Sequence, residues 1–382
     1  MNIVDAVEYN ARIRPHATAL VEPDRAIRYA ELSEMVLRTA CALALHGIRD
    51  ADRVAIRMPN SAMHLIAQLA LARIGAVSIP LHTAKPADAL AAFKARFAPA
   101  AVIALSQAQA IDGVPLILAD DHLLQPVSAE QRATPVAPGG AALLSLALSS
   151  GTTGEPKAIG WSHERALEQW RLQQAVRPSG PGIRFLPYMG FDAMYPSAMS
   201  LRLLFGGGTV IVMPDVSLKS LEDAVDRFGA THVLTSPALI TRHFDKLPPG
   251  GQRFPGLVSL RLAGSLVPPA MYREFVRRVT SNVVIDYGSS EVGAVATGDR
   301  DTMTLQPRSV GRVVPWVDAQ AVADDGSPLP VGAAGTLRFR GPSFPSGYHD
   351  DPEATARMFS DGWFYPGDYG RVLPDGTLII DG

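Results

Sequence analysis

Short apolar runs alternate with longer helical patterns through the first part of the chain, from residue 27 to about residue 118. Residues 53–58 form a strand-like run, and Ser61 stands where it can cap a helix over residues 62–73. Residues 76–81 then return to a strand pattern. Strands that alternate with helices predict right-handed β–α–β units and a parallel sheet covered by helices on both faces.

The same alternation resumes after a polar, proline-bearing segment at 125–140 that is typical of a surface connection. Strands are expected at 210–213, 231–235, 261–263 and 283–285, and helices at 218–228 and 269–279. Beyond about Ser309, short strands at 317–322, 335–340 and 377–381 lie between Asp-Gly and proline-rich turns. This change predicts a small antiparallel, barrel-like subdomain attached to an α/β body.

The composition narrows the classes of protein to which the chain can belong. Hydrophobic residues make up 47% and charged residues 19%, which is enough apolar surface for a large core. The net charge of −2 argues against a broad surface for nucleic acid or anionic membranes, because both need concentrated positive charge. The single cysteine, Cys41, permits no internal disulfide, and no run of about 20 apolar residues occurs. We therefore expect a cytoplasmic protein with more than one subdomain and without nucleic-acid or membrane partners.

A run of small hydroxyl and glycine residues from Ser149 to Lys157 is the most informative stretch of the chain. It reads Ser-Ser-Gly-Thr-Thr-Gly-Glu-Pro-Lys, follows a strand pattern and leads into a second strand that ends at Ser162, which is expected to cap a helix over residues 163–175. Glycines let backbone N–H groups turn toward one point and hydroxyls add donors, which suits a polyphosphate. The spacing differs from that of the P-loop, because Gly151 and Gly154 are close together and a proline precedes the lysine. Strand, loop and strand predict a flap over phosphates.

The loop resembles the phosphate-binding signature of the adenylate-forming superfamily, which includes acyl- and aryl-CoA synthetases, peptide-synthetase adenylation domains and luciferases. Further segments are similar to motifs of that superfamily in the same order along the chain, at 27–32, 71–80, 286–293, 335–342, 347–359 and 365–371. The resemblance implies a large α/β domain with two mainly parallel sheets covered by helices. Residues 1–308 would form its nucleotide- and acid-binding body as two similar subdomains that divide between about 125 and 200. Residues 309–382 would form the β-barrel-like subdomain of the same large domain.

The polar residues of these motifs have roles that the resemblance implies. Tyr287 would stack on adenine, Ser290 would reach the α-phosphate, and Glu291 would hold Mg²⁺ through a carboxylate oxygen. Asp368 would accept hydrogen bonds from both ribose hydroxyls. Two positions depart from the usual pattern, since Ser290 and Pro366 stand where threonine is common. Glu291 and Ser290 are the expected catalytic residues. The nucleotide is expected to contact Ser149, Ser150, Gly151, Thr152, Thr153, Gly154, Lys157, Asp286, Tyr287, Gly288, Ser289, Ser290 and Asp368.

The pocket for the acid has two interpretations. Phe191-Asp192-Ala193 resembles a motif of amino-acid-activating adenylation domains, in which the aspartate meets the amino group of the substrate. Met194 in place of serine departs from that motif, and residues 187–190 match equally well the pattern of acyl-CoA ligases, in which an aromatic residue or histidine gates the pocket. Both interpretations stay open. Matching segments add Ser236, Ala263, Gly264, Gly288 and Val292 as pocket candidates.

The resemblance implies ATP-dependent activation of a carboxylic acid to an acyl adenylate with release of pyrophosphate, followed by transfer of the acyl group to CoA. ATP and Mg²⁺ are the expected cofactors. The alternatives are an adenylation enzyme that loads the phosphopantetheine of an acyl or peptidyl carrier protein, and a non-catalytic nucleotide-binding module. In the superfamily, an arginine, a hinge residue and a small domain with a catalytic lysine follow the position of Gly382. We therefore expect a truncated form that lacks this C-terminal domain and turns over slowly.

Overall fold

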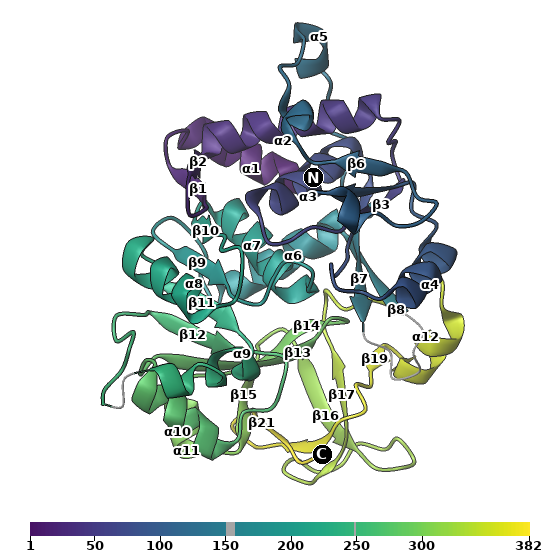
Figure 1. The fold of residues 1–382 in the computed structure, drawn as a ribbon. Helices are drawn as coiled ribbons and strands as arrows, with labels where there is room; N and C mark the ends of the chain where they lie inside the picture. Colours follow the sequence, from purple (N-terminus) through teal and green to yellow (C-terminus); the bar gives the residue numbers. More distant parts are fainter. Residues whose placement is uncertain (150–156, 248–249) are drawn as a thin grey trace. The chain divides into compact units, whose positions relative to one another are not determined.

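The computed structural model describes residues 1–149, 157–247 and 250–382. Contacts within the chain divide it into two compact units, residues 1–229 and 230–382 (Figure 1). The predicted fold class is confirmed, because helices cover mainly parallel strands and an antiparallel part follows. The ranges expected from the sequence for the body and the barrel-like subdomain, 1–308 and 309–382, stay predictions.

The first unit contains two groups of paired strands. One is a sheet with the order β6-β5-β3-β4-β7-β8, whose neighbours are parallel except for the antiparallel β7–β8 pair. In the other, β9, β10 and β1 are parallel and β2 is antiparallel to β1. The strands are β1 (Thr18–Val21), β2 (Ala26–Arg28), β3 (Arg53–Ile56), β4 (Val77–Pro80), β5 (Ala101–Ala104), β6 (Leu116–Leu118), β7 (Leu143–Ser149), β8 (Lys157–Ser162), β9 (Arg184–Pro187) and β10 (Thr209–Ile211).

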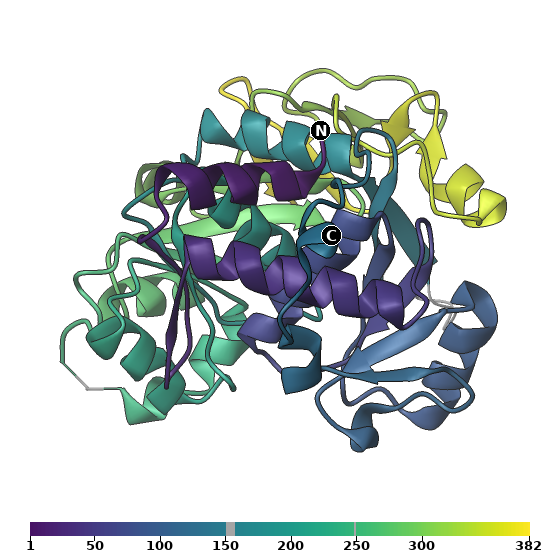
Figure 2. The same ribbon diagram turned by 90° about the horizontal axis from the view of Figure 1, so that it is seen from above.

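Helix α3 lies at the centre of this unit. Every residue from Ala62 to Arg73 is buried, as is typical of a helix that is covered on all sides. It contacts α1, α2, β3 and β4, and Figure 2 shows α1 and α2, in purple, side by side. Gly75 ends α3 in a left-handed conformation with φ of 82°, as its sequence position predicts. The helices are α1 (Ile3–Ile13), α2 (Tyr29–Leu45), α3 (Ala62–Ile74), α4 (Ala87–Phe97), α5 (Ala129–Arg132), α6 (His163–Gln174), α7 (Met194–Gly206) and α8 (Leu218–Glu222), with the shorter turns η1 (Gln107–Gln109), η2 (Asp121–Leu124) and η3 (Asp223–Arg227).

The second unit passes from parallel to antiparallel pairing. Strands β11, β12 and β13 are parallel, and β14, β15, β21, β20 and β17 continue the sheet in antiparallel order. Within this unit, antiparallel pairing therefore begins at β14, earlier in the chain than residue 309, because the β13–β14 hairpin reverses the chain. The strands are β11 (His232–Thr235), β12 (Ser259–Leu262), β13 (Val283–Ser289), β14 (Gly293–Gly298), β15 (Ser309–Val313), β16 (Asp318–Val322), β17 (Gly335–Arg340), β18 (Phe359–Ser360), β19 (Trp363–Phe364), β20 (Tyr369–Val372) and β21 (Thr377–Ile380).

The core of the antiparallel part consists of alternate residues that face inward from these strands. Val295, Val310, Leu337, Phe339 and Leu378 belong to one buried cluster. The helices of this unit are α9 (Pro237–Thr241), α10 (Pro269–Arg278), α11 (Arg300–Leu305) and α12 (Pro352–Met358), with the turn η4 (Phe244–Lys246). Within the described ranges of both units, no helix has the length and apolar composition that crossing a bilayer requires.

Candidate nucleotide and acid sites

The predicted site residues of the second unit gather where its parallel strands end. Ser236 directly follows β11, Ala263 and Gly264 follow β12, and Ser289 ends β13. Because β11, β12 and β13 are parallel, their carboxyl ends lie at the same edge of the sheet, where α/β proteins bind ligands. The hydroxyl of Ser236 accepts a hydrogen bond from the backbone N–H of Leu239 and so begins α9.

The hairpin between β13 and β14 presents the predicted metal and phosphate residues. A β-carbon on Gly288 would lie 2.0 Å from the carbonyl oxygen of Gly293, so the close approach of the two strands requires glycine there. Ser290 and Glu291 lie at the tip of this hairpin. Val292, a predicted pocket residue, is 1% exposed and belongs to the core cluster of the antiparallel part.

The hydroxyl of Ser289 is a candidate for contact with a ligand. Its oxygen is buried and has no hydrogen-bond partner among the described residues. Buried hydroxyls in proteins are normally hydrogen-bonded, so an unsatisfied one needs an explanation. A nucleotide at this edge of the sheet would supply the missing partner.

Glu291 is held by a residue to which the sequence analysis assigned no role. The hydroxyl of Tyr348 donates to Oε1 of Glu291 at 3.0 Å, and both side chains are buried. Burial and the neighbouring Glu291 carboxylate raise the pKa of Tyr348, so its hydroxyl stays protonated as a donor. Gly347 and Tyr348 belong to a segment that is similar to a motif of the superfamily. The contact of Tyr348 with Glu291, however, depends on the fold.

Tyr287 and Asp368, from two separate predicted motifs, are brought together. The Tyr287 hydroxyl donates a hydrogen bond to Oδ2 of Asp368, although 81 positions separate them in the sequence. The Tyr287 ring also makes an edge contact with Phe339, with the ring centres 5.9 Å apart. Burial, followed by the hydrogen bond to Asp368, raises the pKa of Tyr287. The Tyr287 ring and the Asp368 carboxylate therefore lie next to each other, an arrangement that suits the base and the ribose of a nucleoside.

Asp286, the first residue of the same motif, forms an ion pair inside the sheet. Arg261 Nη1 lies 3.2 Å from each carboxylate oxygen of Asp286, and the Thr297 hydroxyl donates to Oδ1 at 3.1 Å. The Asp286 side chain is 3% exposed. These contacts tie β13 to β12 and β14 and so hold the strand that carries Tyr287 and Ser289. The contact of Asp286 with nucleotide stays a prediction.

The two predicted strands on either side of the glycine-rich segment are confirmed as β7 and β8. Ser149 at the end of β7 is paired with Lys157 at the start of β8. The Ser162 hydroxyl accepts a hydrogen bond from the backbone N–H of Arg165 at 3.1 Å and caps α6, as predicted. The loop residues Ser150, Gly151, Thr152, Thr153 and Gly154, together with the side chain of Ser149, lie outside the described residues.

Phe191 and Asp192 occupy different surroundings in the first unit. The Phe191 ring is 1% exposed and packs on the buried imidazole of His64, with ring centres 5.5 Å apart. Asp192 Oδ2 lies 3.2 Å from Nε2 of His82. The backbone N–H of Ala84 donates to Nδ1 of His82, so Nε2 carries the proton that faces Asp192. Sequence reasoning missed His82; its only signal was a polar residue just past the end of a buried strand.

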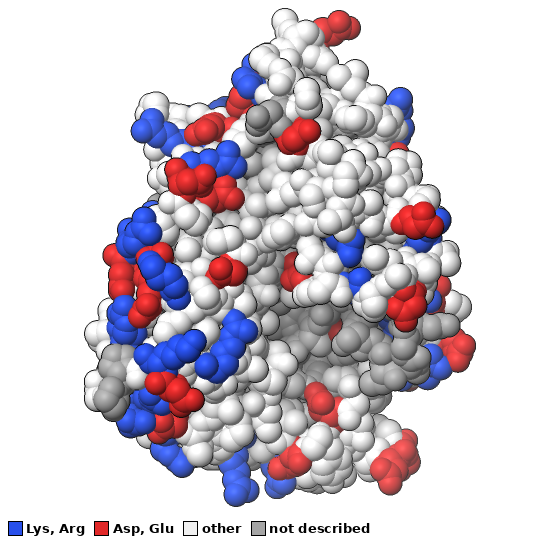
Figure 3. Space-filling model, viewed as in Figure 1, with Lys and Arg blue, Asp and Glu red and all other residues white. Residues whose placement is uncertain are grey.

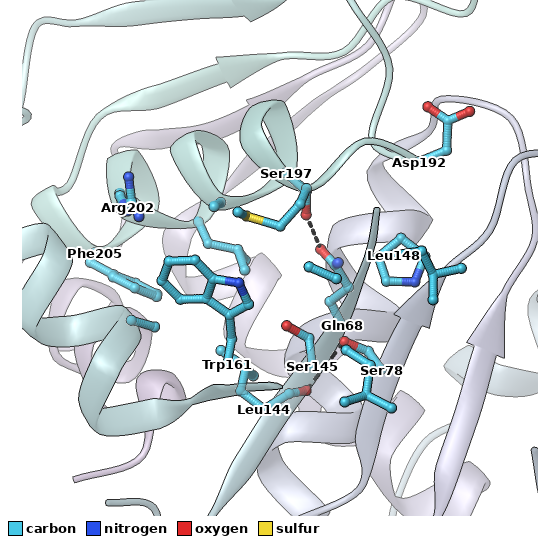
Figure 4. Close-up of a pocket in the computed structure, with 17 residues that line it drawn as sticks. Gln68, Ser78, Leu144, Ser145, Leu148, Trp161, Asp192, Ser197, Arg202 and Phe205 are labelled. Carbon is cyan, nitrogen blue, oxygen red and sulfur yellow. Dashed lines mark hydrogen bonds between the residues drawn. The ribbon is translucent and has the colours of Figure 1, made fainter. Parts of the chain in front are cut away.

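A cavity of about 50 Å³ lies beside Asp192 in the first unit. Its walls are one face of α7, strand β7, and residues from α3, β4, β8 and α6 (Figure 4). In Figure 4 the Ser197 hydroxyl meets the amide of Gln68 near the middle of the group, at 3.0 Å, while Asp192 lies at its margin. Asp192 is thus an acid-pocket candidate that lines this cavity.

The residues present fit a magnesium ion that is held mainly by the phosphates of a bound nucleotide. No cluster of three or more acidic, histidine or cysteine side chains suitable for a metal occurs within the described ranges. Mg²⁺ commonly binds through one or two carboxylates together with phosphate oxygens and water. Glu291 by itself can supply one such carboxylate. The remaining ligands of the ion would then have to come from a bound polyphosphate and water.

Comparison with known proteins gives consistent results. A family described as AMP-binding enzyme matches residues 7–349. Glycine betaine reductase ATRR of Emericella nidulans is 30% identical over 394 residues, which cover 97% of this chain and 30% of that protein. Indoleacetate--CoA ligase of Aromatoleum aromaticum is 27% identical over 406 residues, which cover 100% of this chain and 78% of the ligase. Feruloyl-CoA synthase of an Amycolatopsis species is 29% identical over 400 residues, with coverage of 97% and 76%.

Solved structures share the fold. The crystal structure of VinN has a TM-score of 0.88 at 22% identity, and the alignment covers 100% of this chain and 99% of VinN. The inhibitor-bound N-terminal domain of FACL13 from Mycobacterium tuberculosis has a TM-score of 0.86 at 24% identity, with coverage of 100% and 99%. Because the family match spans most of the sequence and contains the loop and the β13–β14 hairpin, this chain belongs to the AMP-binding enzyme family.

Proposed function

We propose that this chain activates a carboxylic acid with ATP and that the acyl group then passes to the thiol of CoA. A carboxylate oxygen of the acid attacks the α-phosphorus of ATP, the bond from that phosphorus to the bridging oxygen breaks, and pyrophosphate leaves. The thiol then attacks the acyl carbon and AMP leaves. The observation that carries the proposal is the arrangement of Tyr287, Ser289, Glu291 and Asp368 in the second unit, where Tyr287 is bonded to Asp368. Tyr287, Ser289 and Glu291 lie within the matched family region.

Each of these residues has a separate task in the proposal. The Tyr287 ring and the Asp368 carboxylate bind the nucleoside, and the Ser289 and Ser290 hydroxyls donate to phosphate oxygens. Glu291, oriented by Tyr348, would hold Mg²⁺, which offsets the negative charge of the phosphates when it is bound. The contribution of the chain is therefore positioning and charge stabilisation.

CoA is the favoured acceptor because the relatives include indoleacetate and feruloyl ligases of CoA. A carrier protein is the second candidate, since FadD10 of Mycobacterium tuberculosis, named as an acyl-carrier-protein ligase, is 27% identical and covers 100% of this chain. Incubation of the loaded enzyme with CoA or with a phosphopantetheinylated carrier protein separates the two. The thioester that accumulates identifies the acceptor.

Calorimetric titration with ATP and Mg²⁺ tests the nucleotide site. Glu291→Gln and Asp368→Asn remove charge at the two proposed contacts, and Asp318→Asn is the matched control, because Asp318 is 63% exposed and pairs with Arg340 outside the site. Loss of a charge-assisted hydrogen bond costs about 1.5–3 kcal/mol, so we expect ATP binding to weaken about 10–100-fold in the first two variants alone. Unchanged ATP binding in both site variants contradicts the proposal. Pyrophosphate release on adding acids then tests the chemistry, and its absence with every acid favours a non-catalytic nucleotide-binding module.

A further inference from the structure

The side chain of Asp368 has one hydrogen-bond partner among the described residues, and that partner is uncharged. The Tyr287 hydroxyl donates to Oδ2, while Oδ1 accepts no hydrogen bond from these residues. On the face shown in Figure 3, by contrast, basic and acidic side chains are interspersed, and a carboxylate such as that of Glu34 pairs with Arg132. Within the described ranges, Asp368 therefore has no cationic partner and keeps one open oxygen.

The main chain on both sides of Asp368 is held by the sheet of the second unit. The carbonyl of Asp368 accepts from the backbone N–H of Leu337 in β17 at 2.9 Å, and the N–H of Tyr369 donates to the carbonyl of Gly382 at 2.7 Å. These bonds do not fix the carboxylate, because the terminal torsion of an aspartate side chain has no sharp minima. The bond from the Tyr287 hydroxyl is thus the described contact that restricts the carboxylate.

Tyr287 is itself held firmly enough to act as a restraint. Its ring packs against the buried cluster of the antiparallel part and makes an edge contact with Phe339, which belongs to that cluster. Its main chain lies in β13, where it is paired with Ala296 of β14. Burial raises the pKa of the Tyr287 hydroxyl, so the group stays protonated at neutral pH and can donate.

The bond between Tyr287 and Asp368 makes the two carboxylate oxygens unequal. An ionised carboxylate offers about four lone-pair positions, two on each oxygen. The Tyr287 hydroxyl uses one position on Oδ2, so a ribose hydroxyl at Oδ2 shares this oxygen with it. A ribose hydroxyl at Oδ1 meets no competing donor among the described residues, and it makes the stronger charge-assisted bond.

We propose that Tyr287 is a positioning residue that orients Asp368 through its hydroxyl, and that the two ribose hydroxyls of the nucleotide are recognised unequally as a result. The hydroxyl that bonds to Oδ1 provides most of the discrimination against deoxyribonucleotides. The hydroxyl that shares Oδ2 with Tyr287 provides less. This inference rests on the proposed function, because it takes the Tyr287–Asp368 pair as the nucleoside subsite, and Tyr287 acts in it through Asp368.

The test compares ATP with 2′-deoxy-ATP, 3′-deoxy-ATP and 2′,3′-dideoxy-ATP in calorimetric titrations at saturating Mg²⁺. In the parent, we expect the loss of one ribose hydroxyl to weaken binding about 10–100-fold and the loss of the other about 3-fold or less. Tyr287→Phe keeps the ring and removes the hydroxyl. We expect it to weaken ATP about 3–10-fold, because the freed carboxylate must be ordered on binding, and to bring the two monodeoxy nucleotides closer in affinity.

Two controls separate orientation of Asp368 from a general effect on the pocket. Dideoxy-ATP has no hydroxyl for Asp368, so Tyr287→Phe should bind it as tightly as the parent does. Tyr369→Phe should bind all four nucleotides like the parent, because Tyr369 is 49% exposed and its hydroxyl donates to the backbone carbonyl of Ala334. Equal losses for the two monodeoxy nucleotides in the parent, or a Tyr287→Phe variant that loses dideoxy-ATP as much as ATP, overturn the inference. The series on the parent needs no variant, so it still decides the matter if Tyr287→Phe fails to fold.

A measurement without ligand separates this inference from the proposed function. Absence of ATP binding by the parent refutes the proposed function and the unequal recognition of ribose, and the contact itself is then tested by a double-mutant cycle of melting temperatures. Tyr287→Phe should lower the melting temperature of the parent but not that of Asp368→Ala, in which the hydroxyl has already lost its acceptor. An equal decrease in both backgrounds overturns the orienting role of Tyr287.

Discussion

Replacing Tyr348 with phenylalanine tests whether Glu291 is oriented for a metal ion. The Tyr348 hydroxyl lies 3.0 Å from Glu291 Oε1, and the two residues are 8% and 9% exposed. A hydrogen bond to a charged group in such surroundings contributes about 1.5–3 kcal/mol. The aromatic ring remains and keeps its edge contact with Phe359, whose ring centre is 5.7 Å away. The substitution therefore removes the hydrogen bond and little packing.

The expected functional effect follows from the same energy. Loss of a group that orients a metal ligand weakens metal affinity about 10–100-fold, which corresponds to about 1.4–2.8 kcal/mol and matches the hydrogen bond. The assay is calorimetric ATP binding over a series of Mg²⁺ concentrations, which yields the apparent magnesium affinity. Tyr369→Phe is the control, because Tyr369 is 49% exposed and its hydroxyl donates to the backbone carbonyl of Ala334. If Tyr348→Phe leaves the magnesium dependence unchanged while Glu291→Gln abolishes it, the hydrogen bond does not orient the ligand and the reasoning is wrong.

Three further predictions concern stability. Arg261→Met leaves the buried Asp286 carboxylate without its guanidinium, so hydrogen exchange in β12–β14 should report local destabilisation of about 3–5 kcal/mol. The double variant Arg261→Met/Asp286→Leu should recover most of that stability. Equal destabilisation in the single and the double variant contradicts the ion-pair argument. Gly288→Ala places a carbon 2.0 Å from the Gly293 carbonyl oxygen, so the β13–β14 hairpin should open and ATP binding measured by calorimetry should weaken. A variant that binds ATP as tightly as the parent rules out the steric argument. Burial lowers the pKa of His64 from 6.5 to about 3, so the unfolded chain binds a proton that the folded chain excludes; stability is complete above about pH 6.5 and falls by up to about 1.4 kcal/mol per pH unit toward pH 3. The free energy of unfolding, measured with urea at each pH between 7 and 4, should fall less steeply with decreasing pH in His64→Leu than in the parent. The same pH dependence in both proteins contradicts this account.

Several elements could be predicted because their signals are local. Strand β17 is observed at Gly335–Arg340, as expected from its alternation and flanking turns, and β8 at Lys157–Ser162. The Ser162 cap is confirmed by its hydrogen bond to the N–H of Arg165. Expected helix 218–228 is formed in two parts, α8 (Leu218–Glu222) and the π-helical turn η3 (Asp223–Arg227), because periodicity does not distinguish these hydrogen-bond registers.

The partners of the site residues could not be predicted from local signals. The sequence indicated Glu291 and Tyr287 through their motif, yet it gave no means of pairing Glu291 with Tyr348 or Tyr287 with Asp368. Such contacts depend on which strands lie next to each other and in what register, and a shift of one residue turns a side chain to the opposite face. The same holds for Arg202, which in the sequence is one cation on a helix and in the fold is buried beside a cavity.

By itself, the sequence determined the α/β alternation, the glycine and hydroxyl composition of the segment from Ser149 to Lys157, and the residue types available for nucleotide and metal. These are properties of neighbouring positions, since periodicity, capping and turn formation act over a few residues. Only the tertiary structure decided that the Tyr348 hydroxyl bonds to Glu291, that His82 pairs with Asp192, and that Arg202 is buried in the lining of a cavity. Those outcomes arise because packing sets residues distant in sequence side by side and removes them from water, which turns an ordinary charge or hydroxyl into a group that requires a partner.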